Sequence, residues 1–226
     1  MTLTSGRGPL SAHPAGRFTP AIPTPTVYVE PFQRRVRGVV GGRAVIDSER
    51  VLLVHRPGDP PSYAFPADDV TEVPSEAVPE APGHVRVPWE AVEAWFEEED
   101  QIRGSHPRNP YHRVECLTTR RRLVVEVQGV VLVDTTDTLG VFETALAPLL
   151  YVRPDDVRMD LLRPSPTTTY CGYKGTATYW TATIDDAEVP DVAWSYEDPF
   201  PEFHRGRGRL TFDATRATVR HDLPTA

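Results

Sequence analysis

The sequence lacks the features of several protein classes. No apolar run approaches the ~18 residues that span a membrane, and the N-terminus has no apolar stretch of the secretory kind. The two cysteines, Cys116 and Cys171, are too few for a disulfide scaffold or a four-cysteine zinc site. A formal net charge of −8 argues against binding to nucleic-acid phosphates. We therefore expect a cytoplasmic globular protein with no cofactor, no metal site, no nucleic-acid partner and no membrane contact.

Proline, by contrast, is abundant, with 24 in 226 residues. Residues 1–26 hold prolines at positions 9, 14, 20, 23 and 25 and show no apolar period. Such a segment buries too little surface to offset the entropy lost on ordering. We predict a flexible Pro-rich tail over 1–26, with a docking segment anchored by Arg17 and Phe18 as the alternative.

Short β-like runs dominate the rest of the chain. Residues 36–40 and 43–47 flank Gly41-Gly42, and residues 123–127 and 130–134 flank Gln128-Gly129, which are two-residue hairpin signals. This pattern predicts an all-β fold of antiparallel sheets, arranged as a sandwich, barrel or tent-like pair. One exception is the segment 88–99, where Trp89, Val92 and Phe96 follow a helical spacing and predict a short helix.

The sequence also indicates an internal duplication. Residues 39–70 fall on 126–157 at an offset of 87, which places Gly42 on Gly129 and Asp47 on Asp134. Further on, Ala94-Trp95 matches Ala193-Trp194 at an offset of 99, which implies twelve extra residues in the second copy. We interpret 27–116 as a degenerate first β domain and 117–224 as a second one. Drift after duplication is the alternative explanation for the extra residues.

Several unusual motifs of the second copy occur in one order. They are Phe142-Glu143-Thr144, Cys171-Gly172-Tyr173-Lys174-Gly175, Tyr179-Trp180, Ala193-Trp194-Ser195-Tyr196 and Asp198-Pro199-Phe200-Pro201-Glu202. With them, residues 117–221 resemble the domain of unknown function 427 family, and 27–116 looks like the degenerate first domain of its two-domain members. The resemblance implies a small tent-like β domain of a fold on which relatives often bind zinc through CxxC pairs. This chain has no such pairs, so zinc does not carry over.

The segment from Cys171 to Gly175 is the strongest candidate for chemistry. An ammonium beside a thiol favours the nucleophilic thiolate, so Lys174 would activate Cys171. Alternatively, Lys174 forms a Schiff base or holds an anionic group, and Cys171 is only packed. Glu143 ends a predicted strand and would serve as acid or base if it faces Lys174. The catalytic candidates are therefore Cys171, Lys174 and Glu143.

Aromatic residues and one carboxylate complete the predicted ligand-binding set. Its members are Tyr173, Tyr179, Trp180, Tyr196 and Glu202. Aromatic walls with a few polar groups are typical of small-molecule sites, although they are equally typical of a β core. The basic run that follows Glu202, from His204 to Arg209, either binds an anionic substrate or forms a solvated loop.

These residues leave three functions open. In the first, the second domain binds or transforms a small anionic or carbonyl metabolite, with Cys171, Lys174 and Glu143 converging on one surface. In the second, it is a non-catalytic structural or interaction module with a buried Cys171 and a solvated Lys174. The third, nucleotidyl transfer, is the label that some members of the family carry. It has little support here, because no glycine-rich phosphate loop is present.

Overall fold

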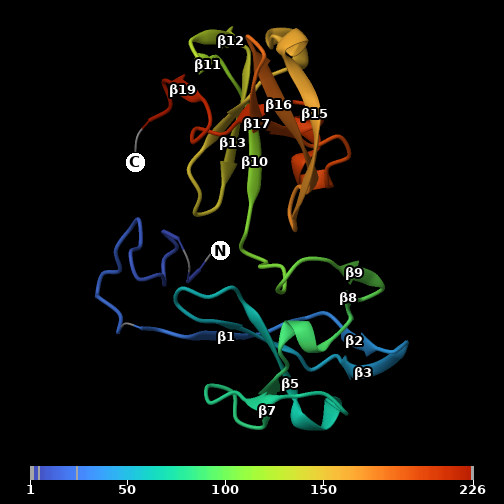
Figure 1. Cartoon of the computed structure of the whole chain (residues 1–226). Helices are drawn as coiled ribbons and strands as arrows, with labels where there is room; N and C mark the ends of the chain where they lie inside the picture. Colours follow the sequence, from blue (N-terminus) through green and yellow to red (C-terminus); the bar gives the residue numbers. More distant parts are fainter. Residues whose placement is uncertain (1–2, 5, 24, 225–226) are drawn as a thin grey trace. The chain divides into compact units, whose positions relative to one another are not determined.

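The structure is a computed structural model that describes residues 3–4, 6–23 and 25–224. The chain forms two compact units, Met1–His112 and Arg113–Ala226. In Figure 1 the first runs from blue to green and the second from green to red. Both are built almost wholly from antiparallel strands and short 3₁₀ turns, which confirms the predicted fold class. None of the sheets that the structure describes closes into a barrel.

The first unit contains two sheets. One has the strand order β1-β4-β5-β7-β6 and the other the order β3-β2-β8-β9. The strands are β1 (Tyr28–Pro31), β2 (Val36–Val40), β3 (Arg43–Ser48), β4 (Leu52–His55), β5 (Ser62–Pro66), β6 (Glu76–Ala77), β7 (His84–Arg86), β8 (Ala94–Glu97) and β9 (Asp100–Ile102). Two 3₁₀ turns, η1 (Ala67–Asp69) and η2 (Trp89–Ala91), lie between them.

The second unit contains three sheets, with the strand orders β10-β13-β14, β12-β11-β19 and β15-β16-β17-β18. The strands are β10 (Val114–Thr119), β11 (Leu123–Val127), β12 (Val130–Thr135), β13 (Thr138–Glu143), β14 (Leu149–Tyr151), β15 (Leu162–Cys171), β16 (Gly175–Ile184), β17 (Ala187–Ser195), β18 (Thr211–Phe212) and β19 (Thr218–His221). The 3₁₀ turns are η3 (Pro154–Asp156), η4 (Met159–Leu161) and η5 (Pro201–Gly206).

The two predicted hairpins form as the turn residues require. Gly41 and Gly42 have φ values of +56° and +75°, and Gln128 and Gly129 have values of +49° and +81°. Two consecutive positive φ values are the signature of the two-residue turn whose twist matches that of the flanking strands. The hairpins β2–β3 and β11–β12 follow directly.

Strand pairing in the two units repeats at the offset of 87. Val36 pairs with Ser48 as Leu123 pairs with Thr135, and both hairpins carry a register shift at the same place. The pairs β1–β4 and β4–β5 recur as β10–β13 and β13–β14 in identical register. Even the link from strand to 3₁₀ turn recurs, since Ser48 donates to Asp69 as Thr135 donates to Asp156. The domain duplication remains our interpretation of these repeated pairings.

The helix predicted over 88–99 is limited to the single 3₁₀ turn η2. From Ala94 the chain is the strand β8, which buries Trp95 and Glu97 and leaves Ala94 and Phe96 half-buried. Residues 94–97 therefore follow the two-residue alternation of a β-strand, and Trp95 reaches the core from a strand that pairs with β2.

The sequence match at offset 99 was wrong as a structural equivalence. Trp95 lies opposite Gly38 as Val219 lies opposite Val125, so β8 corresponds to β19. Ala193 and Trp194 instead lie in β17, between β16 and β18. The second unit thus gains far more than twelve residues. Val85 pairs with Phe65 as Leu210 pairs with Val152, the counterpart of Phe65, so the offset between Val85 and Leu210 is 125. The long strands β15, β16 and β17 account for the increase from 87.

Two hydrophobic clusters form the core of the second unit. One is aliphatic and includes Val125, Val133, Val192 and Leu210. The other is rich in aromatic side chains and includes Tyr151, Tyr196 and Phe203 together with Cys116. The second cluster joins the sheet β10-β13-β14 to the inserted strands, and the candidate residues gather there.

Candidate functional site

A buried ion pair joins the inserted hairpin to the end of β13. Lys174 lies in the turn between β15 and β16, and Glu143 is the last residue of β13. The Lys174 Nζ atom lies 2.5 Å from Glu143 Oε2, and each side chain is 9% exposed. The structure therefore brings together two of the three predicted catalytic residues. The structural-module hypothesis required Lys174 to extend into solvent, and it does not.

Aromatic rings surround the ammonium group. The Nζ atom is 5.8 Å from the ring centre of Tyr196 and 5.9 Å from that of Phe203, which is cation–π range. Phe203 in turn contacts both Tyr151 and Tyr196 edge-on, with ring centres 5.2 Å apart. Burial raises the pKa of Tyr196, and the nearby Cys171 and Glu143 raise it further. Tyr196 is therefore a neutral hydrogen-bonding group at physiological pH.

The turn that carries Lys174 is fixed by its backbone. The N–H of Phe200 donates to the carbonyl oxygen of Lys174 at 3.2 Å. Gly175 has a φ of +99°, and a Cβ atom there would lie 3.3 Å from the carbonyl oxygen of Asp198. Glycine is needed at this position for both reasons. The segment 198–200 thus holds the hairpin tip against the unit, which sets the reach of the lysine side chain.

Both cysteines are free and belong to the same aromatic cluster. Cys116 on β10 is buried, whereas Cys171 at the end of β15 is half-buried. Burial raises the pKa of the Cys116 thiol, and the charges of Arg205 and Lys174 partly oppose that rise. Because of its greater exposure, Cys171 is the thiol that a small reagent would reach.

The predicted aromatic residues divide between the two cores. Tyr173 and Tyr179 pack on the aromatic cluster, and the Tyr179 ring lies 6.2 Å from Trp194. Trp180 packs on the aliphatic cluster instead, and its indole N–H donates to Ser195 Oγ at 3.1 Å. Glu202 is exposed in η5. Of the predicted ligand-binding set, Tyr173, Tyr179 and Tyr196 therefore belong to the aromatic cluster, whereas Trp180 and Glu202 do not.

One neighbour of Lys174 was missed from sequence, and so was a strong signal for the lysine itself. Phe203 is distant in the chain and comes near Lys174 only through the packing of the aromatic cluster, where it contacts Tyr151. The missed signal is that Lys174 is the only lysine of the sequence, because the other 23 of the 24 Lys and Arg residues are arginines. A chain that uses arginine for every other cation has lysine at its one buried ammonium site.

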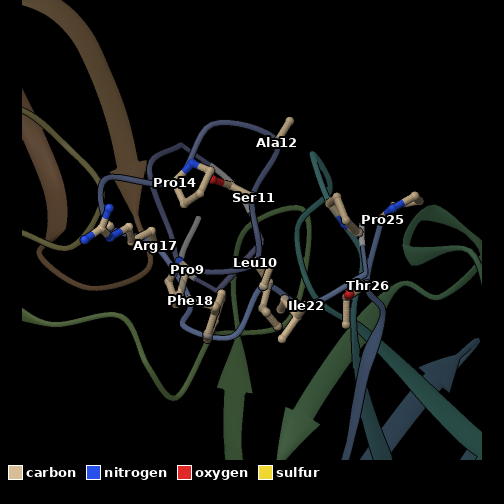
Figure 2. A pocket seen from close by; sticks show the side chains of 13 residues that line it. Pro9, Leu10, Ser11, Ala12, Pro14, Arg17, Phe18, Ile22, Pro25 and Thr26 are labelled. Atoms are coloured by element: carbon tan, nitrogen blue, oxygen red, sulfur yellow. The ribbon is translucent and has the colours of Figure 1, made fainter.

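Among the described residues of the first unit are two cavities that no predicted catalytic or ligand-binding residue lines. One, of about 520 Å³, is lined by residues of the N-terminal segment together with Pro57, and Figure 2 shows Leu10, Phe18 and Ile22 gathered around it. Nearer the start of the predicted tail, the Thr4 carbonyl accepts a hydrogen bond from the Gly58 N–H at 3.0 Å. Residues 1–2, 5 and 24 of the predicted tail lie outside the described residues. The other cavity, of about 450 Å³, lies beside Trp89 and Tyr63.

Within the described part of the chain, no group of three or more His, Cys, Asp or Glu side chains is placed to hold a metal ion. In the same residues, no helix has the length and apolar character needed to cross a membrane.

Comparison with known proteins gives a family for the second unit. The search of curated proteins found no match. Residues 115–222 match the family model described as Domain of unknown function (DUF427), a range that contains Glu143, Cys171, Lys174 and the inserted strands. Residues 115–222, which make up nearly all of the second unit, are therefore a domain of the DUF427 family.

Proposed function

We propose that the second unit binds a small metabolite with an anionic or carbonyl group, and that Lys174 is the residue that contacts this group. Glu143 accepts the proton that the lysine amine loses when it attacks a carbonyl carbon, and returns it afterwards. For a purely anionic ligand, the ammonium itself is the binding group. Cys171 and Tyr196 form part of the wall around the ligand.

The observation that carries this proposal is the single lysine. Arginine stays protonated at all physiological pH values and is a rigid donor, whereas a lysine amine can lose its proton and act as a nucleophile. The 23 arginines show that this sequence otherwise prefers guanidinium groups. The one exception is 9% exposed, bonded to a carboxylate and close to two aromatic rings. Such a position favours a role that arginine cannot perform.

Stability alone accounts poorly for this pair. The cost of removing two charges from water roughly cancels their attraction, so buried ion pairs seldom add net stability over apolar residues of similar size. The hairpin tip is already fixed by backbone contacts from residues 198–200. A structural clasp is therefore the weaker hypothesis, and it predicts that Lys174 is inert.

Nucleotidyl transfer finds no support in the positions of the acidic residues. Asp155 and Asp156 lie in η3, where Asp156 accepts a hydrogen bond from Thr135. Asp69 accepts the same bond from Ser48 in the first unit. A carboxylate that repeats with the strand pairing is explained by the fold.

Reductive trapping tests the proposal, with glyoxylate as a probe that is both anionic and a carbonyl compound. The Lys174 amine attacks the aldehyde carbon, water leaves, and added cyanoborohydride supplies the hydride that reduces the imine to a stable secondary amine. Because the chain has one lysine, peptide mass spectrometry reads the site against a single competing amine, the amino terminus.

We expect an adduct at Lys174 whose formation is slowed by competing non-carbonyl anions and by the Glu143→Gln substitution. The Lys174→Arg variant is the matched control for modification of the amino terminus. The proposal is contradicted if only the amino terminus is modified. It is also contradicted if an adduct forms at Lys174 at a rate that neither competing anions nor Glu143→Gln changes.

A further inference from the structure

Two arginines face each other across an isolated bridge in the second unit. Val152 and Leu210 exchange two backbone hydrogen bonds of 2.9 Å, which places the next residues, Arg153 and Arg209, directly opposite. Like charges at directly opposed positions of antiparallel chains repel each other. The repulsion requires a compensating group nearby.

The compensation on the Arg153 side is visible. Arg153 pairs with Asp137, and its Nε atom lies 3.9 Å from Asp156 Oδ2. Arg209 has no such partner. Within the described chain its Nη1 atom is buried and has no hydrogen-bond acceptor, although the side chain as a whole is half-buried. A guanidinium group cannot shed its charge to escape this situation.

A third guanidinium group, that of Arg205, is close enough for its charge to act on Arg209. Arg205, in η5, donates to the carbonyl oxygen of Cys116 and, at 2.8 Å, to Thr118 Oγ1, both of which are neutral acceptors. Burial lowers the pKa of Arg209 and the charge of Arg153 lowers it further; Asp156 opposes this, and the charge of Arg205 adds the smallest lowering effect. In the part of the chain that the structure describes, neither Arg205 nor Arg209 is paired with a carboxylate.

We propose that Arg153, Arg205 and Arg209 form an oxyanion-binding site that takes a phosphate or carboxylate group. A guanidinium group donates parallel hydrogen bonds that match both kinds of oxyanion, and these bonds are stronger than neutral ones. The bound oxygen atoms would accept from the buried Arg209 Nη1 and neutralise the cross-strand repulsion. The site does not depend on Lys174.

Thermal unfolding of the full chain tests this site. The melting temperature is measured in inorganic phosphate and in acetate, each against potassium chloride of equal ionic strength. We expect one of the two anions to raise it by about 2 °C or more in the wild-type protein. A response to phosphate alone identifies a phosphate ligand, and a response to acetate alone identifies a carboxylate.

Variants separate a specific site from a general salt effect. Arg209→Gln and Arg205→Gln should each abolish the rise, whereas the nearby Arg207→Gln should retain it, because Arg207 is paired with the exposed Asp198. If Arg209→Gln does not fold, Arg205→Gln alone decides. Lys174→Arg should also retain the rise, which separates this site from the proposed metabolite site. An equal rise in Arg209→Gln and wild type, or no rise in the wild type with either anion, would overturn the assignment.

Discussion

Replacing Glu143 by glutamine would leave the Lys174 ammonium without a counter-charge in a buried position. Removal of one partner of a buried ion pair costs about 3–5 kcal/mol. Since 9% of each side chain remains exposed, we expect a value near the lower end, about 3 kcal/mol. The double variant Glu143→Gln/Lys174→Met should recover most of this loss, because no uncompensated charge remains.

Urea unfolding, followed by tryptophan fluorescence, measures these differences in the full chain. Trp180 and Trp194 report on the second unit. Arg163→Gln is the matched control, because it breaks a pair with Glu188 whose side chains are 50% and 55% exposed. It should change the stability by less than about 1 kcal/mol. If Glu143→Gln behaves like this control, or the double variant is no more stable than the single one, the account of a desolvated pair is wrong.

Three further predictions follow from packing and burial. Gly206→Ala should destabilise the second unit by about 2 kcal/mol in urea unfolding, because its Cβ would lie 2.1 Å from the fully buried Phe203 ring; unchanged stability would mean that this ring is free to move. Cys171 should react with iodoacetamide in the native protein at pH 8 while Cys116 stays unmodified until the chain unfolds, and equal rates would contradict the difference in burial. Burial lowers the pKa of His55, so as the pH falls the unfolded chain binds a proton at His55 before the folded chain does. The contribution of neutral His55 to the stability is therefore complete above about pH 6.5 and is lost as the pH falls. His55→Gln should therefore lose less thermal stability than the wild type between pH 7 and pH 5, and an identical loss would remove His55 as the cause.

Local signals in the sequence predicted much of the fold. The turns at Gly41-Gly42 and Gln128-Gly129 require positive φ, so the hairpins around them were readable. The strands β15 and β17 were not recognisable from sequence, because Pro164 and Pro190 interrupt their alternation of apolar and polar residues. The structure accommodates irregular pairing there through register shifts near both.

The candidate site was predictable only in part. Its chemistry-bearing residues, Lys174 and Glu143, were named from sequence, and their contact depends on the sheet packing. Tyr179 and Trp180 are neighbours on β16 and point to opposite faces. The alternation of strand residues could not tell which of them joins the aromatic cluster. Phe203 was missed because η5 has no periodic signal and reaches the cluster from a distant part of the chain.

Protection of Lys174 from acetylation tests the central claim most directly. The full chain is treated with a limiting amount of an N-hydroxysuccinimide acetate, alone and with a panel of small 2-oxo acids, dicarboxylates and phosphate esters. Peptide mass spectrometry gives the rate at Lys174, and the amino terminus of the same molecules is the internal standard. The account predicts that at least one compound class lowers the rate at Lys174 several-fold, saturably, and leaves the standard unchanged. A rate at Lys174 that no compound changes relative to the amino terminus would contradict the claim that this lysine binds a metabolite.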